Sequence, residues 1–206
     1  MDDDIANNES SLNSQKNRDL LIKFFPNLAT DSQFVIKSPA TPEYNCIAFA
    51  MGIDGFWVQP YSSNIPWTWW PNCDQGLLPD HLVKAFEALS FERCTDGHYE
   101  EGYDKVALYS KDGKWTHAAK VFDNGALFHS KFGPCFDGTH SGEDTLDGEN
   151  GYGKIFQYMK RLISLRCKSL EALGGKKGVI RVNVPVYLYD KKLFVDLRGR
   201  IGSVSF

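Results

Sequence analysis

The sequence predicts an α+β protein in which helices from the N-terminal half pack on an antiparallel sheet. Large apolar residues recur at helical spacing in residues 79–91, where Leu82 and Phe86 share one face. Further along the chain, strand-like segments are joined by KDG and DNG, which are typical of hairpin turns. These segments form a three-stranded meander and comprise 104–110, 116–122 and 126–132.

Length and composition suit one globular domain. The chain has 206 residues, of which 42% are hydrophobic and 24% charged, enough for a substantial core. No apolar run approaches the roughly 18 residues of a membrane-spanning helix, and the start does not resemble a secretory signal. Residues 1–18 are rich in Asp, Asn and Ser and are expected to be a disordered tail. A single domain is expected over 19–206, with its core at about 40–161.

A short strand is expected at 33–38, and a short helix within the apolar segment that follows. Two helix starts compete: Thr41 as N-cap with Pro42 after it, or Asn45 as N-cap. The second start would place Cys46 in the first turn, where backbone N–H groups stabilise negative charge.

The segment between the two predicted helices is rich in tryptophan and proline and looks irregular. Exposed indoles of Trp69 and Trp70 would suit a substrate-binding clamp beside Cys46. The alternative is a structural lid that folds back over the core.

The end of the chain is basic. A helix is expected over 155–173 and two or three strands over 179–206, so that 162–206 adds a helix and strands to the core. From Lys160 to Arg200, eleven basic and three acidic residues occur in a chain of net charge −3. The net charge argues against a globally basic nucleic-acid binder, and the basic stretch is interpreted as a solvated surface, with a polyanion-binding face as the alternative.

Cysteine usage argues against a disulfide framework. The five cysteines are widely spread, and none forms a CxxC pair or a zinc-ligand spacing with histidine. We therefore expect no metal and no cofactor, and a cytoplasmic location or export without a Sec signal. His140 stands in an acidic loop that lacks the spacing of an EF-hand, so a cation site is disfavoured there.

Cys46 is the candidate nucleophile. A helix N-terminus and a nearby imidazolium both stabilise a thiolate, and His117 at the start of a strand would supply the imidazole within about 4 Å. His129 or Ser130 on the next strand would orient His117, because positions whose numbers sum to about 248 pair around the DNG turn. The alternatives are a buried structural thiol and half-buried strand histidines.

The order of these elements resembles the papain-like hydrolases of the NlpC type, the CHAP amidases and the lecithin–retinol acyltransferase-like enzymes. A helix beginning with Cys is followed by strands reading DKVALYS and THAAKVFDNGALFHSKFG. The resemblance implies a papain-like fold with Cys46, His117 and His129 as catalytic residues. YNCIAFA, THAAKV, SKFG and a late GYG also resemble an uncharacterised bacterial domain family with a YNCIAWA-like motif, where the third polar position falls at Ser130 as readily as at His129.

We therefore expect a cysteine hydrolase, amidase or acyl-transfer enzyme that forms a thioester, with a bacterial effector or toxin as one setting. Peptide, amide and acyl substrates all fit this chemistry, and Asn45, Trp69, Trp70 and Ser130 are the candidate substrate-binding residues. The alternative is a non-catalytic binding module on the same fold, which would use the Trp-rich loop and the basic C-terminal region.

Overall fold

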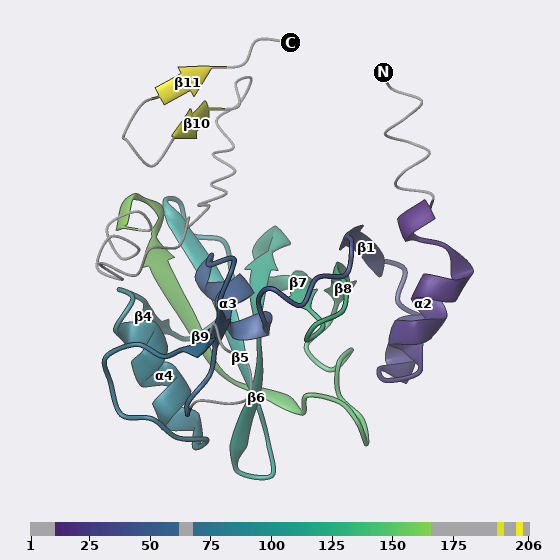
Figure 1. Ribbon diagram of the computed structural model, residues 1–206, viewed down its shortest axis with the longest axis horizontal. Coiled ribbons are helices and arrows are strands. Elements are labelled where there is room, and N and C mark those ends of the chain that lie inside the picture. Colours follow the sequence, from purple (N-terminus) through teal and green to yellow (C-terminus); the bar gives the residue numbers. More distant parts are fainter. Residues whose placement is uncertain (1–10, 62–67, 166–192, 196–200, 204–206) are drawn as a thin grey trace.

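The fold is built on one antiparallel sheet of seven strands (Figure 1). The computed structural model describes residues 11–61, 68–165, 193–195 and 201–203. Across the sheet the strand order is β1-β8-β7-β6-β5-β9-β4, and the predicted α+β class is confirmed. In chain order the strands are β1 (Val35–Ser38), β4 (Glu92–Cys94), β5 (Tyr103–Lys111), β6 (Lys114–Phe122), β7 (Leu127–Lys131), β8 (Asp137–Ser141) and β9 (Lys154–Leu162).

Two short helices pack on one face of this sheet (Figure 1). α3 (Cys46–Met51) lies on β6 and β7, and α4 (Pro79–Glu87) lies against β5, β6 and β9. α2 (Gln15–Ile22) lies at the other end of the sheet, beside β1. Short helical turns also occur at η1 (Pro26–Ala29), η2 (Asp123–Gly125) and η3 (Ile163–Leu165).

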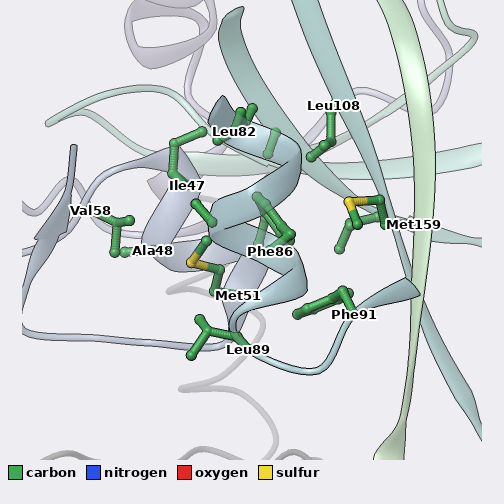
Figure 2. Packing of buried hydrophobic residues seen from close by; sticks show 14 of the residues in the cluster. Ile47, Ala48, Met51, Val58, Leu82, Phe86, Leu89, Phe91, Leu108 and Met159 are labelled. Carbon is green, nitrogen blue, oxygen red and sulfur yellow. The ribbon is translucent and has the colours of Figure 1, made fainter. Parts of the chain in front are cut away.

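The main core lies between α3, α4 and the sheet (Figure 2). Helical spacing brings Leu82 and Phe86 of α4 against Ile47 and Met51 of α3, and Leu108 of β5 completes the contact from the sheet. Each of these side chains is almost fully buried and contributes about 1.5–3 kcal/mol relative to exposure. The packing fixes α3 over β6 and β7.

The opposite face of the sheet is covered by the N-terminal segment and by the loop after β8. Leu21 and Phe25 pack with Ile36 and Phe132 in a second cluster. Tyr152 from the loop contacts this cluster and also a third, smaller cluster on β5, β6 and β7. Both faces of the central strands are therefore buried.

The predicted helix over 155–173 is wrong in its first half, because β9 occupies Lys154–Leu162. β9 pairs with both β5 and β4, so ladder hydrogen bonds override the local helical pattern. Its buried Arg161 donates from Nη2 to the carbonyl of Met51 at 3.0 Å. This carbonyl ends α3, where a positive charge is favourable. Residues 166–173 lie outside the described residues.

The N-terminal segment differs from the predicted tail over residues 11–18. α2 begins at Gln15, and the Asn13 amide exchanges two hydrogen bonds with the backbone of Ile36, at 2.8 and 3.0 Å. These contacts dock the segment on β1, so its polar composition is compensated by side chain–backbone pairing. Residues 1–10 lie outside the described residues.

Two further sheets have two strands each. β2 (Trp57–Val58) and β3 (Thr68–Trp69) pair in parallel within the Trp-rich segment. β10 (Leu193–Val195) and β11 (Ile201–Ser203) pair antiparallel, as expected of the C-terminal strands. Among the described residues, no helix has the length and apolar character needed to cross a bilayer.

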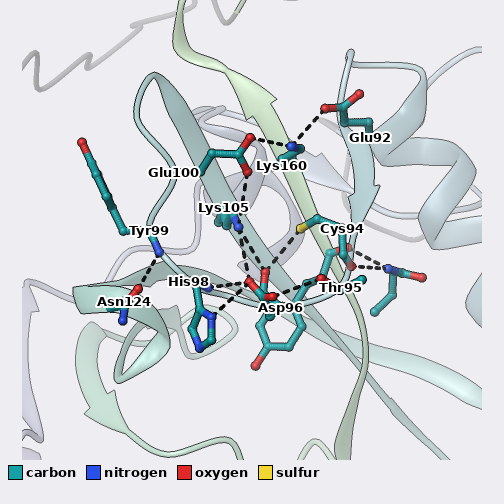
Figure 3. A network of polar contacts seen from close by, with 12 residues as sticks. Glu92, Cys94, Thr95, Asp96, His98, Tyr99, Glu100, Lys105, Asn124 and Lys160 are labelled. Atoms are coloured by element: carbon teal, nitrogen blue, oxygen red, sulfur yellow. Dashed lines mark hydrogen bonds and ion pairs between the residues drawn. The ribbon is translucent and has the colours of Figure 1, made fainter.

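A polar network fixes the loop between β4 and β5 (Figure 3). Glu100 contacts the ammonium groups of Lys160 at 2.6 Å and Lys105 at 3.6 Å. Asp96 contacts Lys105 at 3.5 Å and accepts the backbone N–H of His98 at 2.9 Å. Ion pairs near the surface contribute about 0–1 kcal/mol each, so this network orders the loop more than it stabilises the fold.

Truncating the α4 core residue should test how far the sheet depends on this helix. Phe86→Ala leaves a cavity in the main core and should lower the free energy of unfolding by about 3–5 kcal/mol in urea denaturation. Phe122→Ala is the matched control, because Phe122 is 46% exposed, and it should cost less than about 1 kcal/mol. Equal losses in the two variants would contradict the proposed packing.

Candidate functional site

Asn45 determines where α3 begins. Its Oδ1 accepts the N–H groups of Ala48 at 3.0 Å and Val58 at 3.2 Å, and its Nδ2 donates to the Val58 carbonyl at 2.9 Å. The helix therefore starts at Cys46, and the start at Thr41 is wrong. The Asn45 amide is buried and makes three hydrogen bonds, so Asn45 acts as the cap of α3, and its role in substrate binding stays a prediction.

The Cys46 thiol is protonated at neutral pH. Burial raises its pKa from 9.0 to about 11, while the backbone N–H groups of Ala118, Ile47 and Cys46 itself and the charge of Lys131 act in the opposite direction. Cys46 is only 8% exposed to solvent. The helix N-terminus therefore moderates the pKa of Cys46 but does not overcome desolvation.

His117 is buried on the opposite face of β6 from α3. Its ring stacks on Tyr152, with centroids 4.0 Å apart, and meets the edge of Tyr109 at 5.4 Å. Nε2 lies 3.0 Å from the Ser130 hydroxyl, and Nδ1 is buried without a hydrogen-bond partner. Burial and the neighbouring His140 hold the pKa of His117 well below its usual value, so the imidazole is neutral.

Ser130 connects His117 to a second buried histidine. The Ser130 hydroxyl lies 2.9 Å from Nε2 of His140, whose ring stacks on Phe128. Burial lowers the pKa of His140 to about 4. The sequence places His140 at the edge of an acidic loop, whereas it stands within β8 in the core. Ser130, predicted to bind substrate, is enclosed between the two rings.

His129 does not orient His117, and the reason is a one-residue difference in register. Ala119 pairs with Ser130 and Lys120 with His129, so paired numbers sum to 249 where the sequence predicts about 248. A slip of one residue exchanges the two faces of a strand. His129 therefore points to the face of α3, where its Nε2 contacts Asp137 at 2.6 Å. The alternative, Ser130, takes the orienting position.

The Cys46 thiol and the His117 ring lie on opposite faces of β6, near Ala118, and no hydrogen bond joins them. The pairing of β6 with β7 ends at Ala119 and Ser130, while β6 continues along β5. The thiol lies next to the N–H of Ala118, the residue after His117. Tyr152, which stacks on His117, has a pKa raised by burial and then by Cys46. The predicted direct thiol–imidazole contact is thus absent from this resting arrangement.

Lys131 is a functional candidate that sequence reasoning missed. Its buried ammonium group donates to the carbonyls of Thr41 at 2.9 Å, Gly133 at 2.6 Å and Cys135 at 2.6 Å. These contacts tie the segment before α3 to the turn between β7 and β8. The sequence signal that could have found it is a charged residue within an apolar strand, since Lys131 directly follows the buried Ser130 in SKFG.

Trp69 and Trp70 belong to the core more than to an open surface. Trp70 is buried and stacks on Trp115, with centroids 6.1 Å apart. Trp69 is half-buried and packs against the main core. The burial of Trp70 fits the alternative of a structural lid, and substrate binding by Trp69 and Trp70 stays a prediction. Among the described residues, no group of three or more His, Cys, Asp or Glu side chains is arranged to hold a metal ion.

Acidification should destabilise the fold because His117 and His140 are neutral in the folded protein. The pKa of His140 is about 4 and that of His117 is lower than usual, against 6.5 for an unperturbed histidine. The unfolded chain therefore binds more protons, and stability falls as pH drops below about 6.5. For His140 the loss reaches about 3 kcal/mol by pH 4.

Urea denaturation between pH 4 and pH 8 measures this loss. The variant His140→Gln should show a shallower decline, and His98→Gln, on the surface, is the matched control that should keep the wild-type decline. Identical declines for all three proteins would contradict neutral burial of His140.

Comparison with known proteins identifies a family but no function. No curated protein and no solved structure gives a significant match. A family model, described as a domain of unknown function (DUF7689), matches residues 35–160, which contain the whole seven-stranded sheet except for the end of β9. The chain therefore belongs to the DUF7689 family.

Proposed function

We propose that this protein is a cysteine hydrolase or acyl-transfer enzyme in which Cys46 is the nucleophile and His117 the general base. The observation that carries the proposal is the buried chain from His117 through Ser130 to His140, which leaves Nδ1 of His117 unpaired beside the strand position that the Cys46 thiol contacts. A base oriented through one ring nitrogen, with the other nitrogen open, is the arrangement that thiol activation requires.

Burying these polar groups is costly, which favours a functional reason for them. A buried polar atom without a partner costs about 1–3 kcal/mol, and Nδ1 of His117 is such an atom. An apolar residue at position 117 would pack against Tyr109 and Tyr152 without this cost. Unpaired polar atoms retained in a core are a feature of catalytic sites more than of purely structural ones.

In the proposed reaction, the Cys46 S–H proton passes to Nδ1 of His117 as the sulfur attacks a carbonyl carbon. The tetrahedral intermediate expels an amine or alcohol, which takes the proton from Nδ1, and a thioester remains. Water, activated by Nδ1, then attacks the thioester carbon, and the carboxylic acid and the thiol are released. An acceptor amine or alcohol in place of water gives acyl transfer.

The resting pair is neutral in this proposal, so proton transfer accompanies attack. With the pKa of Cys46 near 11 and that of His117 below its usual value, a standing thiolate–imidazolium pair is unfavourable. The proposal therefore requires the Cys46 thiol and the His117 ring to come together around the edge of β6 when substrate binds, since catalytic hydrogen bonds are often long before that. We extend the proposal to a papain-like arrangement, because a helix that begins with cysteine packs on the strand that carries the histidine.

A non-catalytic binding module is the second candidate. It is favoured by the burial of Cys46, by its raised pKa and by the fully enclosed His117 ring. In that case Cys46 is a core thiol, and removal of His117 changes only stability. Thiol reactivity separates the two candidates.

The test is the alkylation rate of Cys46 by iodoacetamide, followed by peptide mass spectrometry between pH 5 and pH 11. The hydrolase proposal predicts measurable labelling of Cys46 at pH 7 and a decrease on the order of 10²-fold in His117→Ala, because the base is lost. Cys94, half-buried on β4, is the internal control and should label equally in both proteins.

Two outcomes would overturn the hydrolase proposal in favour of the binding module. Cys46 would either react only as pH approaches 11, or react at the same rate in wild type and His117→Ala. Unfolding curves of both proteins, measured alongside, ensure that only folded protein is compared.

A further inference from the structure

We infer that His140, acting through Ser130, fixes the tautomer of His117 so that Nδ1 of His117 is a free lone pair. The assignment follows from hydrogen-bond directions along β6, β7 and β8. Its catalytic consequence rests on the function proposed above, whereas the tautomer itself does not.

The Ser141 carbonyl sets the donor–acceptor direction of the hydrogen bonds that link His117, Ser130 and His140. A carbonyl oxygen only accepts hydrogen bonds, and it lies 3.5 Å from Nδ1 of His140, so this nitrogen carries the proton. Asp31 holds Ser141 in place: its carboxylate accepts the Ser141 N–H at 2.7 Å and the hydroxyl at 2.8 Å. The same carbonyl also accepts the Thr145 hydroxyl, which uses its second lone pair.

The remaining assignments follow in sequence. Neutral His140 with a proton on Nδ1 has a lone pair on Nε2, which accepts the Ser130 hydroxyl at 2.9 Å. A hydroxyl has one proton to donate, so Ser130 must accept from its other neighbour. That neighbour is Nε2 of His117, at 3.0 Å, which therefore carries the proton of the His117 ring.

The reverse direction is unfavourable at both ends of the chain. It would place the proton of His117 on Nδ1, which has no partner, and orphaned buried N–H groups are rare. It would also turn a lone pair of His140 toward the Ser141 carbonyl. The lowered pKa of His140, about 4, agrees with a neutral ring at pH 7, and stacking on Phe128 holds that ring in its plane.

His140 and Ser130 are therefore positioning residues for the proposed reaction. A free lone pair on Nδ1 is the form of His117 that can accept the Cys46 proton. With the opposite tautomer, Nδ1 would hold a proton already and His117 could not act as a base through that atom.

Nuclear magnetic resonance of the ¹⁵N-histidine-labelled full chain tests the tautomer directly. Long-range ¹H–¹⁵N correlation at pH 7 distinguishes protonated from unprotonated ring nitrogens, and His117→Gln identifies the His117 signals. We expect a proton on Nε2 of His117 and on Nδ1 of His140. A proton on Nδ1 of His117 would overturn the inference. The measurement is made on the wild-type protein, and the His117→Gln variant is needed only to assign the signals.

Two variants at position 140 test the role of the second histidine. His140→Phe keeps a ring against Phe128 but removes the acceptor, so His117 should become a mixture of tautomers. His140→Gln offers an amide oxygen to Ser130 and should restore the wild-type pattern. His98→Gln, on the surface, should leave the His117 signals unchanged, and a fixed His117 tautomer in His140→Phe would overturn the role of His140.

Cys46 alkylation at pH 7 separates failure of this inference from failure of the proposed function. The rate should fall on the order of tenfold in His140→Phe and recover in His140→Gln. A fall in His117→Ala without one in His140→Phe overturns the positioning role. The expected tautomer together with unchanged rates in both variants overturns the hydrolase proposal and leaves the tautomer assignment supported.

Discussion

The register of the β6–β7 hairpin is the constraint on which the candidate site depends. The turn at Asp123–Gly125 pairs Ala119 with Ser130, and this pairing turns Ser130 toward His117 and His129 toward α3. A slip of one residue would exchange them, so that His129, which contacts Asp137 in the observed register, would take the place of the serine beside His117. Asn124 adopts a left-handed backbone conformation in this turn, with φ of 55°, which asparagine tolerates better than most residues.

The second constraint is the position of α3, which is held at both ends. Asn45 caps its start and joins it to β2, while Arg161 of β9 donates to its last carbonyl. Lys131 fixes the segment before it through the Thr41 carbonyl. A helix of only six residues has little stability alone, so these three anchors, together with core packing, are what hold Cys46 against β6.

Local signals in the sequence predicted the meander, α4 and the approach of Cys46 to the strand of His117, and they narrowed the start of α3 to Thr41 or Asn45 without choosing between them. They failed where the outcome depends on distant partners. β9 is a strand because β4 and β5 pair with it, and no local pattern in 155–162 contains that information. The choice between His129 and Ser130 depended on one residue of register, which the DNG sequence alone does not fix, and His140 could be located in the core only once β8 was known to pair with β7.

The neutrality of its buried groups explains why this candidate site can be stable although Nδ1 of His117 has no hydrogen-bond partner. A thiol of raised pKa and imidazoles of lowered pKa are all neutral at pH 7, so Cys46, His117 and His140 add no buried charge to the resting site and avoid the large cost of one. In the proposed reaction, charge would develop only when the proton moves from sulfur to nitrogen during attack. A low-polarity site makes that separation costly unless the receiving imidazole is already oriented, and in the proposed mechanism the hydrogen bonds that link His117 to Ser130 and Ser130 to His140 supply this orientation before any substrate arrives.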